Sequence, residues 1–170
     1  RIFKLLDTEV KVKDPKLPLS ISTIQGKIEF KDVWFAYNDK EDVLCDISFC
    51  VQPGEKVAIV GATGAGKTSI ISLLARFYDP QKGKILLDGK NIRSYTLDQL
   101  RGNIGYVTQM PFLFSKTIQE NILFGAEGTM EGLSKEDITN KVLRASGISH
   151  LHADISDFPD SYDTLIGERG

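Results

Sequence analysis

Alternating hydrophobic and polar residues mark two segments near the start of the chain as half-buried β-strands. In residues 28–37 the apolar positions change phase once, which predicts a strand with a bulge near Asp32 or two short strands. Residues 45–51 alternate without interruption, a pattern typical of an antiparallel strand. The polar residues at 38–42 predict a turn between these two segments.

Continuous apolar runs indicate strands of a second kind. Residues 57–60 are Val-Ala-Ile-Val, and residues 104–107 form a similar short run. Such runs are typical of strands that are covered on both faces, so both segments are expected to be buried strands. A further short strand is predicted at residues 85–87, before a turn at Asp88-Gly89.

Apolar residues spaced three and four apart predict the helices. An amphipathic helix is expected over residues 70–77, with Asp79-Pro80 ending it. Three further helices are predicted from their spacing and caps: residues 97–101 after Thr96, residues 118–124, and a helix that starts at Ser134 with Asp137 in its first turn.

The composition is that of an ordinary globular chain. Its 170 residues include 21 Lys+Arg and 23 Asp+Glu, a net charge of −2, whereas nucleic-acid binders usually have a basic excess. Hydrophobic residues make up 41%, which argues against disorder. No charge-free stretch approaches the roughly 18–20 apolar residues of a membrane span. Cys45 and Cys50 are expected to be core or half-buried residues.

The segment GATGAGKT, Gly61–Thr68, has the strongest chemical signal in the chain. It matches the P-loop pattern G-x-x-x-x-G-K-[ST] at every fixed position, between a predicted buried strand and a predicted amphipathic helix. The alternative, a glycine-rich turn before a helix, does not explain the Lys-Thr pair. The sequence therefore predicts a nucleotide-binding loop.

Each residue type in this loop suits a phosphate chain. Gly61, Gly64 and Gly66 permit positive φ and close approach of the backbone, so successive N–H groups are able to surround an anion. The start of the following helix adds further N–H donors. Lys67 brings a positive charge to the β- and γ-phosphates, and the hydroxyl of Thr68 is a ligand for Mg²⁺.

Other features of the chain distinguish among nucleotide-binding families. GTPases need an N-K-x-D motif to bind the base, but here Asn140-Lys141 is followed by Val142 and Leu143. Small nucleotide kinases and RecA-like proteins usually have the P-loop on an early strand, without the antiparallel strands predicted here. These families are therefore disfavoured.

The chain resembles the nucleotide-binding domain of ABC transporters, specifically the exporter type typified by bacterial lipid and multidrug exporters. The resemblance extends over nearly the whole chain and comprises five segments in the family's order. Arg1–Asp7 resembles the segment after the last transmembrane helix, and Ile28–Tyr37 resembles the first strand with its adenine-stacking aromatic. Gly83–Arg101 resembles the region before the Q-loop, Ile104–Ile122 the Q-loop itself, and Tyr162–Gly170 the segment before the signature motif.

This resemblance implies an α/β fold: a P-loop NTPase core of the ABC ATPase type, an antiparallel β-subdomain and the start of a helical subdomain after Gln109. Residues 1–25 are expected to be a linker from an upstream transmembrane domain, and residues 26–170 a partial nucleotide-binding domain. The signature motif, Walker B strand, catalytic glutamate and switch histidine are expected beyond Gly170. The parent would be an integral membrane protein with this domain on the cytoplasmic face.

The resemblance also implies the site residues. The expected ATP-binding residues are Tyr37, Gly61, Ala62, Thr63, Gly64, Ala65, Gly66, Lys67, Thr68 and Ser69. Mg²⁺ is expected at Thr68 and Gln109, where Gln109 also positions the attacking water, and no catalytic base is expected in this chain. From the residues alone, Tyr37 is equally a strand aromatic on an apolar face, and Gln109 a polar residue at the end of a strand.

Three other groups of residues resemble functional sites. Ile85–Asp88 resembles a Walker B pattern, but Gly89 follows it instead of Glu, so we interpret it as a strand and turn. His150, His152 and Asp154 are interpreted as solvated residues, because a helix would point His152 away from the other two. Phe112 to Phe114 are either core residues or an apolar surface for a coupling helix of the membrane domain.

The predicted function is ATP-driven export by the parent protein. ATP would be hydrolysed between two nucleotide-binding domains, in a homo- or heterodimer of a half or full transporter, with a transmembrane domain as partner and no nucleic acid. By itself this chain is expected to bind Mg-ATP weakly with almost no ATPase activity. Two alternatives are an ATP-binding module without turnover and a soluble ABC ATPase of DNA repair or chromosome organisation. Those soluble ATPases have the P-loop very near the N-terminus, whereas 60 residues precede Gly61 here.

Overall fold

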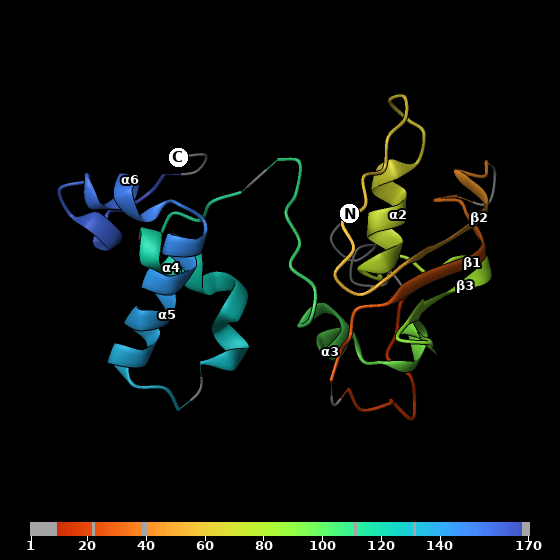
Figure 1. Ribbon diagram of the computed structural model, residues 1–170, viewed down its shortest axis with the longest axis horizontal. Helices are drawn as coiled ribbons and strands as arrows, with labels where there is room; N and C mark the ends of the chain where they lie inside the picture. Colours follow the sequence, from red (N-terminus) through yellow and green to blue (C-terminus); the bar gives the residue numbers. More distant parts are fainter. Residues whose placement is uncertain (1–9, 22, 39–40, 111, 131, 168–170) are drawn as a thin grey trace, which may run out of the picture. The chain divides into compact units, whose positions relative to one another are not determined.

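A computed structural model describes residues 10–21, 23–38, 41–110, 112–130 and 132–167. The chain forms two compact units, residues 1–106 and residues 107–170 (Figure 1). The segment Arg1–Asp7 of the predicted linker lies outside the described residues, as do residues 39–40 of the predicted turn.

An antiparallel sheet organises the first unit. Its order is β2-β1-β3-β4, and every neighbouring pair is antiparallel, which confirms the predicted β-subdomain. The four strands are β1 (Ile28–Phe35), β2 (Leu44–Val51), β3 (Lys82–Leu87) and β4 (Lys90–Asn91). Asp88 and Gly89 connect β3 to β4 with φ of 51° and 78°, the positive values that a type I′ hairpin turn needs.

A β-bulge in β1 explains the change of phase in the sequence. The pairing of β1 with β2 shifts between Phe30 and Val33, and Asp32 between them has φ of 51°. The Ser48 hydroxyl accepts the Asp32 N–H at 2.8 Å. Because of the bulge, Phe30 and Val33 are both buried in the same core, although they differ in phase.

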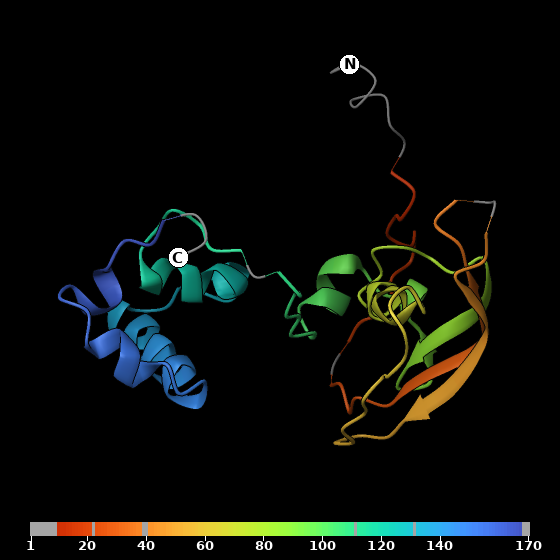
Figure 2. The same cartoon turned by 90° about the horizontal axis from the view of Figure 1, so that it is seen from above.

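Helix α2 (Lys67–Leu74) packs against this sheet through Leu73, which joins the buried cluster of strand residues. Figure 2, which looks along α2, shows the helix on one side of the strands. The helix ends earlier than predicted, so Phe77 lies beyond it and is exposed. A 3₁₀ turn η1 (Ile92–Ser94) and helix α3 (Leu97–Arg101) follow β4, and Thr96 forms a capping box with Gln99 as the sequence predicts.

The two continuous apolar runs do not form strands, so this prediction is wrong. Residues 57–60 and 104–107 have no regular structure, and the exposed fractions are 88% for Val60 and 93% for Val107. A strand of this kind needs hydrogen-bonding neighbours at its edges and cover on both faces. Among the described residues, none of the four strands pairs with either run.

The two cysteines are exposed, which contradicts the prediction that they are buried or half-buried. Both lie on β2, which is an edge strand. The register of β2 slips between Leu44 and Ile47, where Asp46 has φ of 52°. This irregularity buries Leu44 and leaves Cys45 outside the core.

The second unit is helical. Its elements are α4 (Ile118–Leu123), η2 (Phe124–Thr129), α5 (Lys135–Ile148), α6 (His152–Ser156) and η3 (Ser161–Asp163). The predicted starts of α4 and α5 are confirmed by capping boxes at Thr117 and Ser134. The Thr117 N–H and hydroxyl donate to Glu120, which lowers the pKa of that carboxyl. No helix of the described residues is long and apolar enough to cross a membrane.

Candidate nucleotide-binding site

The glycine-rich loop leads directly into the first turn of α2. Gly64 and Gly66 both have φ of 84°, a left-handed conformation that glycine adopts without strain. Gly66 is the N-cap of α2, and no side chain caps this helix end. The first N–H groups of an α-helix have no partner within the helix. The loop therefore directs backbone donors toward an anion at this position.

Gly66 also allows the loop to lie close to β2. A Cβ atom built on Gly66 would be 2.7 Å from Cδ2 of Leu44 and 3.1 Å from the carbonyl oxygen of Val43. A Cβ atom on Gly64 would meet nothing within 4 Å. The two glycines thus share a backbone conformation but differ in surroundings: Gly66 is packed against protein, and Gly64 faces open space.

The side chain of Lys67 turns back over the loop. Its ammonium Nζ donates to the carbonyl oxygens of Gly61 at 2.8 Å and Ala62 at 2.7 Å. These bonds engage two of the three N–H donors of the ammonium. The positive charge is therefore held beside the helix N-terminus, where an anion gains from both.

A pocket of about 300 Å³ lies at this end of α2. Its lining residues are Tyr37, Val43, Gly64, Ala65, Gly66, Lys67, Thr68 and Ser69. A second hollow of about 400 Å³ shares Tyr37 and Val43 and adds Asn38 and Glu41. The described residues that line the first pocket include no carboxylate, so this pocket offers a cation and N–H donors without a general base.

Tyr37 is fixed between the loop and an aromatic cluster. Its ring makes edge contacts with Phe35, at 4.8 Å between centroids, and with Tyr78, at 5.1 Å. Its hydroxyl lies 2.9 Å from the hydroxyl of Ser69, which is buried on α2. The tyrosine still exposes 43% of its surface at the pocket. Sequence reasoning missed the bond to Ser69, because no motif connects positions 32 residues apart.

Thr68 and Gln109 are the two predicted Mg²⁺ ligands. Thr68 is exposed and lines the pocket, so its hydroxyl is accessible to a hard cation that also binds phosphate oxygens, and the residues present fit such an ion. Gln109 is exposed in an irregular segment of the second unit. Among the described residues, no group of three or more His, Cys, Asp or Glu side chains is arranged to hold a metal ion.

Asp88, the acid of the Walker B-like segment, is engaged elsewhere. Its carboxylate accepts the N–H groups of three successive residues, Gln25, Gly26 and Lys27, at 2.8, 3.0 and 2.9 Å. The interpretation of this segment as a strand and turn is confirmed by β3 and the hairpin turn after it. Burial, with the Asp88 charge as a smaller cause, raises the pKa of the nearby Tyr95 hydroxyl.

Two groups in the second unit have structural partners. His152 was expected to be solvated; it is exposed, and its Nδ1 lies 2.7 Å from the Tyr162 hydroxyl. That hydroxyl is in turn 2.6 Å from the hydroxyl of the buried Ser146. Phe114 contacts the ring of Phe112 at 5.1 Å between centroids, and Phe112 is itself exposed. The contacts of Tyr162 connect α5, α6 and η3, whereas the contact between Phe112 and Phe114 lies within the irregular segment before α4.

Comparisons with known proteins show the family to which the chain is related. The family described as ABC transporter matches residues 44–162, which include the whole P-loop. The chain is 44% identical over 168 residues to the ABC transporter ATP-binding protein YwjA of Bacillus subtilis, covering 99% of this chain and 28% of that protein. It is 41% identical over 170 residues to the ATP-dependent lipid A-core flippase of Coxiella burnetii, covering 99% of this chain and 27% of the flippase.

A solved structure has the same fold. It is described as a bacterial Atm1-family ABC exporter with ATP bound, and the match has a TM-score of 0.85 at 38% identity, covering 99% of this chain and 28% of that one. The mitochondrial iron-sulfur clusters transporter atm1 of Neurospora crassa is 42% identical over 171 residues, covering 99% of this chain and 23% of the transporter. The chain thus spans about a quarter of the length of these relatives.

Proposed function

The chain belongs to the ABC transporter family, and from this premise we propose that it is the ATP-binding part of an exporter. The observation on which the proposal depends is the open N-terminus of α2, where Gly66 is the N-cap without a side-chain cap and Lys67 lies over the loop. The names of two relatives, a lipid A-core flippase and an iron-sulfur clusters transporter, support the exporter class.

In this proposal the P-loop holds the phosphate chain of ATP. The backbone N–H groups of residues 61–69 surround the phosphates, and Lys67 neutralises charge on the β- and γ-phosphates. The adenine stacks on the exposed surface of Tyr37, which borders both the loop pocket and the neighbouring hollow. Aromatic stacking on a base is worth about 1–3 kcal/mol in nucleic-acid sites, so one tyrosine is enough to orient the adenine.

Mg²⁺ would be held by the Thr68 hydroxyl and by phosphate oxygens, with Gln109 as a further ligand that also orients water. When bound, the ion supplies neutralisation of phosphate charge. The lining of the loop pocket has no carboxylate, so we place the general base outside this lining. Hydrolysis would then need groups from the rest of the protein.

The remaining parts of the proposal concern the whole protein. Residues 1–25 would be the linker from a transmembrane domain, and residues 26–170 part of a nucleotide-binding domain at the cytoplasmic face of a membrane. Two such domains would pair, and ATP hydrolysis between them would drive export. The fold, the P-loop and the exporter relatives support this arrangement.

Calorimetric titration of the full-length protein with Mg-ATP tests the proposal. Lys67→Ala removes a charge-assisted contact to phosphate, and hydrogen bonds to charged groups are worth about 1.5–3 kcal/mol, so we expect roughly a 10-fold to 100-fold loss of affinity. Lys56→Ala is the matched control, because Lys56 is exposed and is not among the residues lining the pocket. Unchanged affinity in Lys67→Ala would refute the assignment of this loop.

A further inference from the structure

The C-terminal end of α2 has an unusual residue in a strained position. The helix ends in a Schellman motif, in which the Phe77 N–H donates to the Ser72 carbonyl at 2.9 Å and the Arg76 N–H to the Leu73 carbonyl at 3.0 Å. Arg76 occupies the left-handed position of this motif with φ of 53°. Glycine is the usual residue there, because a left-handed backbone is unfavourable for residues with a Cβ. We therefore expect contacts of the Arg76 side chain to offset this backbone cost.

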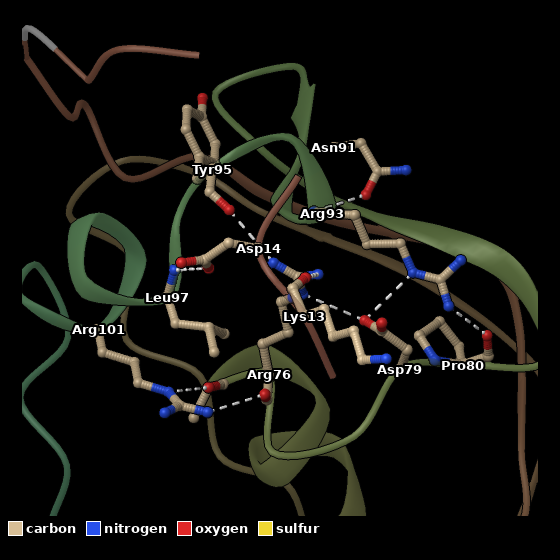
Figure 3. A network of polar contacts seen from close by, with 11 residues as sticks. Lys13, Asp14, Arg76, Asp79, Pro80, Asn91, Arg93, Tyr95, Leu97 and Arg101 are labelled. Atoms are coloured by element: carbon tan, nitrogen blue, oxygen red, sulfur yellow. Dashed lines mark hydrogen bonds and ion pairs between the residues drawn. The ribbon is translucent and has the colours of Figure 1, made fainter. Parts of the chain in front are cut away.

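The guanidinium of Arg76 joins three separate segments of the chain (Figure 3). It is 97% buried and donates to the Lys13 carbonyl at 2.8 Å, to the Tyr95 carbonyl at 3.2 Å and to the carboxylate of Asp79 at 3.2 Å. A buried arginine is stable only when its donors are satisfied, and here each of its three nitrogens has a partner. One of these partners, the carbonyl of Lys13, lies 63 residues earlier in the chain.

Two more contacts hold the segment of residues 13–19 at the same place. The Asp14 carboxylate accepts the N–H of Leu97, the first residue of α3, at 2.8 Å. The Leu19 N–H donates to the Ser94 carbonyl at 2.8 Å. This segment is therefore attached to α3 and η1 as well, and the contact with Arg76 connects it to the residues that end α2.

We propose that Arg76 is a positioning residue that couples the segment of residues 13–19 to the P-loop helix, so that nucleotide binding at one end of α2 and the placement of this segment at the other end affect each other. The inference rests on the proposed nucleotide site. Helix α2 is eight residues long, about 12 Å at 1.5 Å per residue, and transmits a displacement as one rigid element. By linkage, if bound nucleotide favours the ordered form of the segment, the ordered segment raises the affinity for nucleotide by the same free energy.

Arg76→Gly is the variant that separates coupling from folding. It removes the guanidinium, while glycine suits the left-handed position at the end of α2. Arg93→Ala is the matched control, because Arg93 shares the Asp79 carboxylate at 3.1 Å and donates to the Pro80 carbonyl at 2.9 Å, whereas the contact with the Lys13 carbonyl is made by Arg76 (Figure 3). Arg76→Lys retains the charge with a different donor geometry, so the exchange rate of residues 13–21 in this variant is expected to lie between those of the parent and Arg76→Gly.

Hydrogen–deuterium exchange of the full-length protein, with and without Mg-ATP, provides the measurement. In the parent we expect nucleotide to slow exchange both in residues 61–74 and in residues 13–21. In Arg76→Gly we expect residues 13–21 to exchange at least tenfold faster and to stop responding to nucleotide, while residues 61–74 remain protected. Affinity for Mg-ATP should fall about threefold to tenfold, and Arg93→Ala should behave like the parent.

The possible outcomes distinguish this inference from the proposed function. Protection of residues 61–74 without any response of residues 13–21 in the parent would overturn the coupling and leave the nucleotide site intact. An unchanged response of residues 13–21 in Arg76→Gly would overturn the role of Arg76. If nucleotide protects neither segment, both the proposed function and the coupling are wrong.

Discussion

The two ends of α2 satisfy their backbone groups in opposite ways. At the N-terminus, Gly66 leaves the helix without a side-chain cap, and Lys67 and Thr68 line a pocket. At the C-terminus, the Arg101 guanidinium donates to the carbonyls of Ala75 and Arg76 at 3.1 and 3.0 Å. Helix ends have unpaired donors at the start and unpaired acceptors at the finish. Here the chain itself binds acceptors at the C-terminal end, whereas we propose that the donors at the N-terminal end bind nucleotide.

The largest effect is expected from adding a methyl group to the N-cap. Gly66→Ala places a Cβ at 2.7 Å from Leu44 in a backbone with φ of 84°. We expect a loss of about 2–4 kcal/mol in the free energy of unfolding, from about 1–2 kcal/mol of backbone strain and a similar overpacking cost. Urea unfolding of the nucleotide-free protein measures this loss.

Gly64→Ala is the control for this prediction, because its φ is the same and its Cβ would meet nothing within 4 Å. Only the backbone strain remains in this variant, so we expect a loss of about 1–2 kcal/mol in the free energy of unfolding. If the two variants unfold at the same urea concentration, the contact between the loop and β2 does not determine the position of the loop.

A smaller effect is expected at the other end of the helix. Arg101→Ala removes two hydrogen bonds to helix carbonyls and a cation–π contact with Phe77 at 5.1 Å. We expect a loss of about 1–2 kcal/mol in the free energy of unfolding. Nucleotide affinity should change by less than about twofold, since Arg101 does not line the loop pocket.

Lys67→Ala is expected to show the reverse pattern, with affinity strongly reduced and stability changed by only about 0.5 kcal/mol, as is usual for accessible positions. Measuring both quantities on both variants tests whether the contacts of Arg101, unlike those proposed for Arg76, are separate from nucleotide binding. A loss of ATP affinity in Arg101→Ala as large as that expected for Arg76→Gly would show that the coupling to the site extends to Arg101.

Short-range signals in the sequence were sufficient for much of this fold. The phase change at Asp32 predicted the bulge, and the caps at Thr96, Thr117 and Ser134 mark the starts of α3, α4 and α5. These features depend on residues within about four positions of one another, as turn and capping chemistry does. The P-loop motif was equally local; its residues Gly64–Thr68 line one pocket, whereas Gly61, Ala62 and Thr63 are not among the lining residues.

Long-range contacts could not be predicted in this way. The apolar runs at 57–60 and 104–107 have the composition of buried strands, but a strand forms only beside a partner, which a local pattern does not specify. The contact of Arg76 with Lys13 joins residues 63 positions apart, and no motif marks it. The local sign of this contact is that an arginine occupies the left-handed position after a helix, and that backbone conformation is known only from the structure.

The smallest effect concerns the hydroxyl of Tyr37. If the ring stacks on adenine, Tyr37→Ala should weaken ATP binding about tenfold, since stacking on a base is worth about 1–3 kcal/mol. Tyr37→Phe keeps the ring and removes only the bond to Ser69, which positions the ring and does not itself contact the base. We therefore expect a loss of about twofold to threefold, the lower end of the roughly 0.5–1.5 kcal/mol that a net hydrogen bond is worth. Calorimetric titration with Mg-ATP measures both.

Ser69→Ala removes the same hydrogen bond by deleting the hydroxyl of its other partner. If the Tyr37 hydroxyl acts only by holding the ring against α2, Ser69→Ala should match Tyr37→Phe, and the double variant should bind ATP no more weakly than either single variant. Additive losses would mean that the two hydroxyls contact the nucleotide separately. Equal affinity of Tyr37→Ala and the parent would make Tyr37 an aromatic residue packed between Phe35 and Tyr78 just after β1, without a role in binding the base.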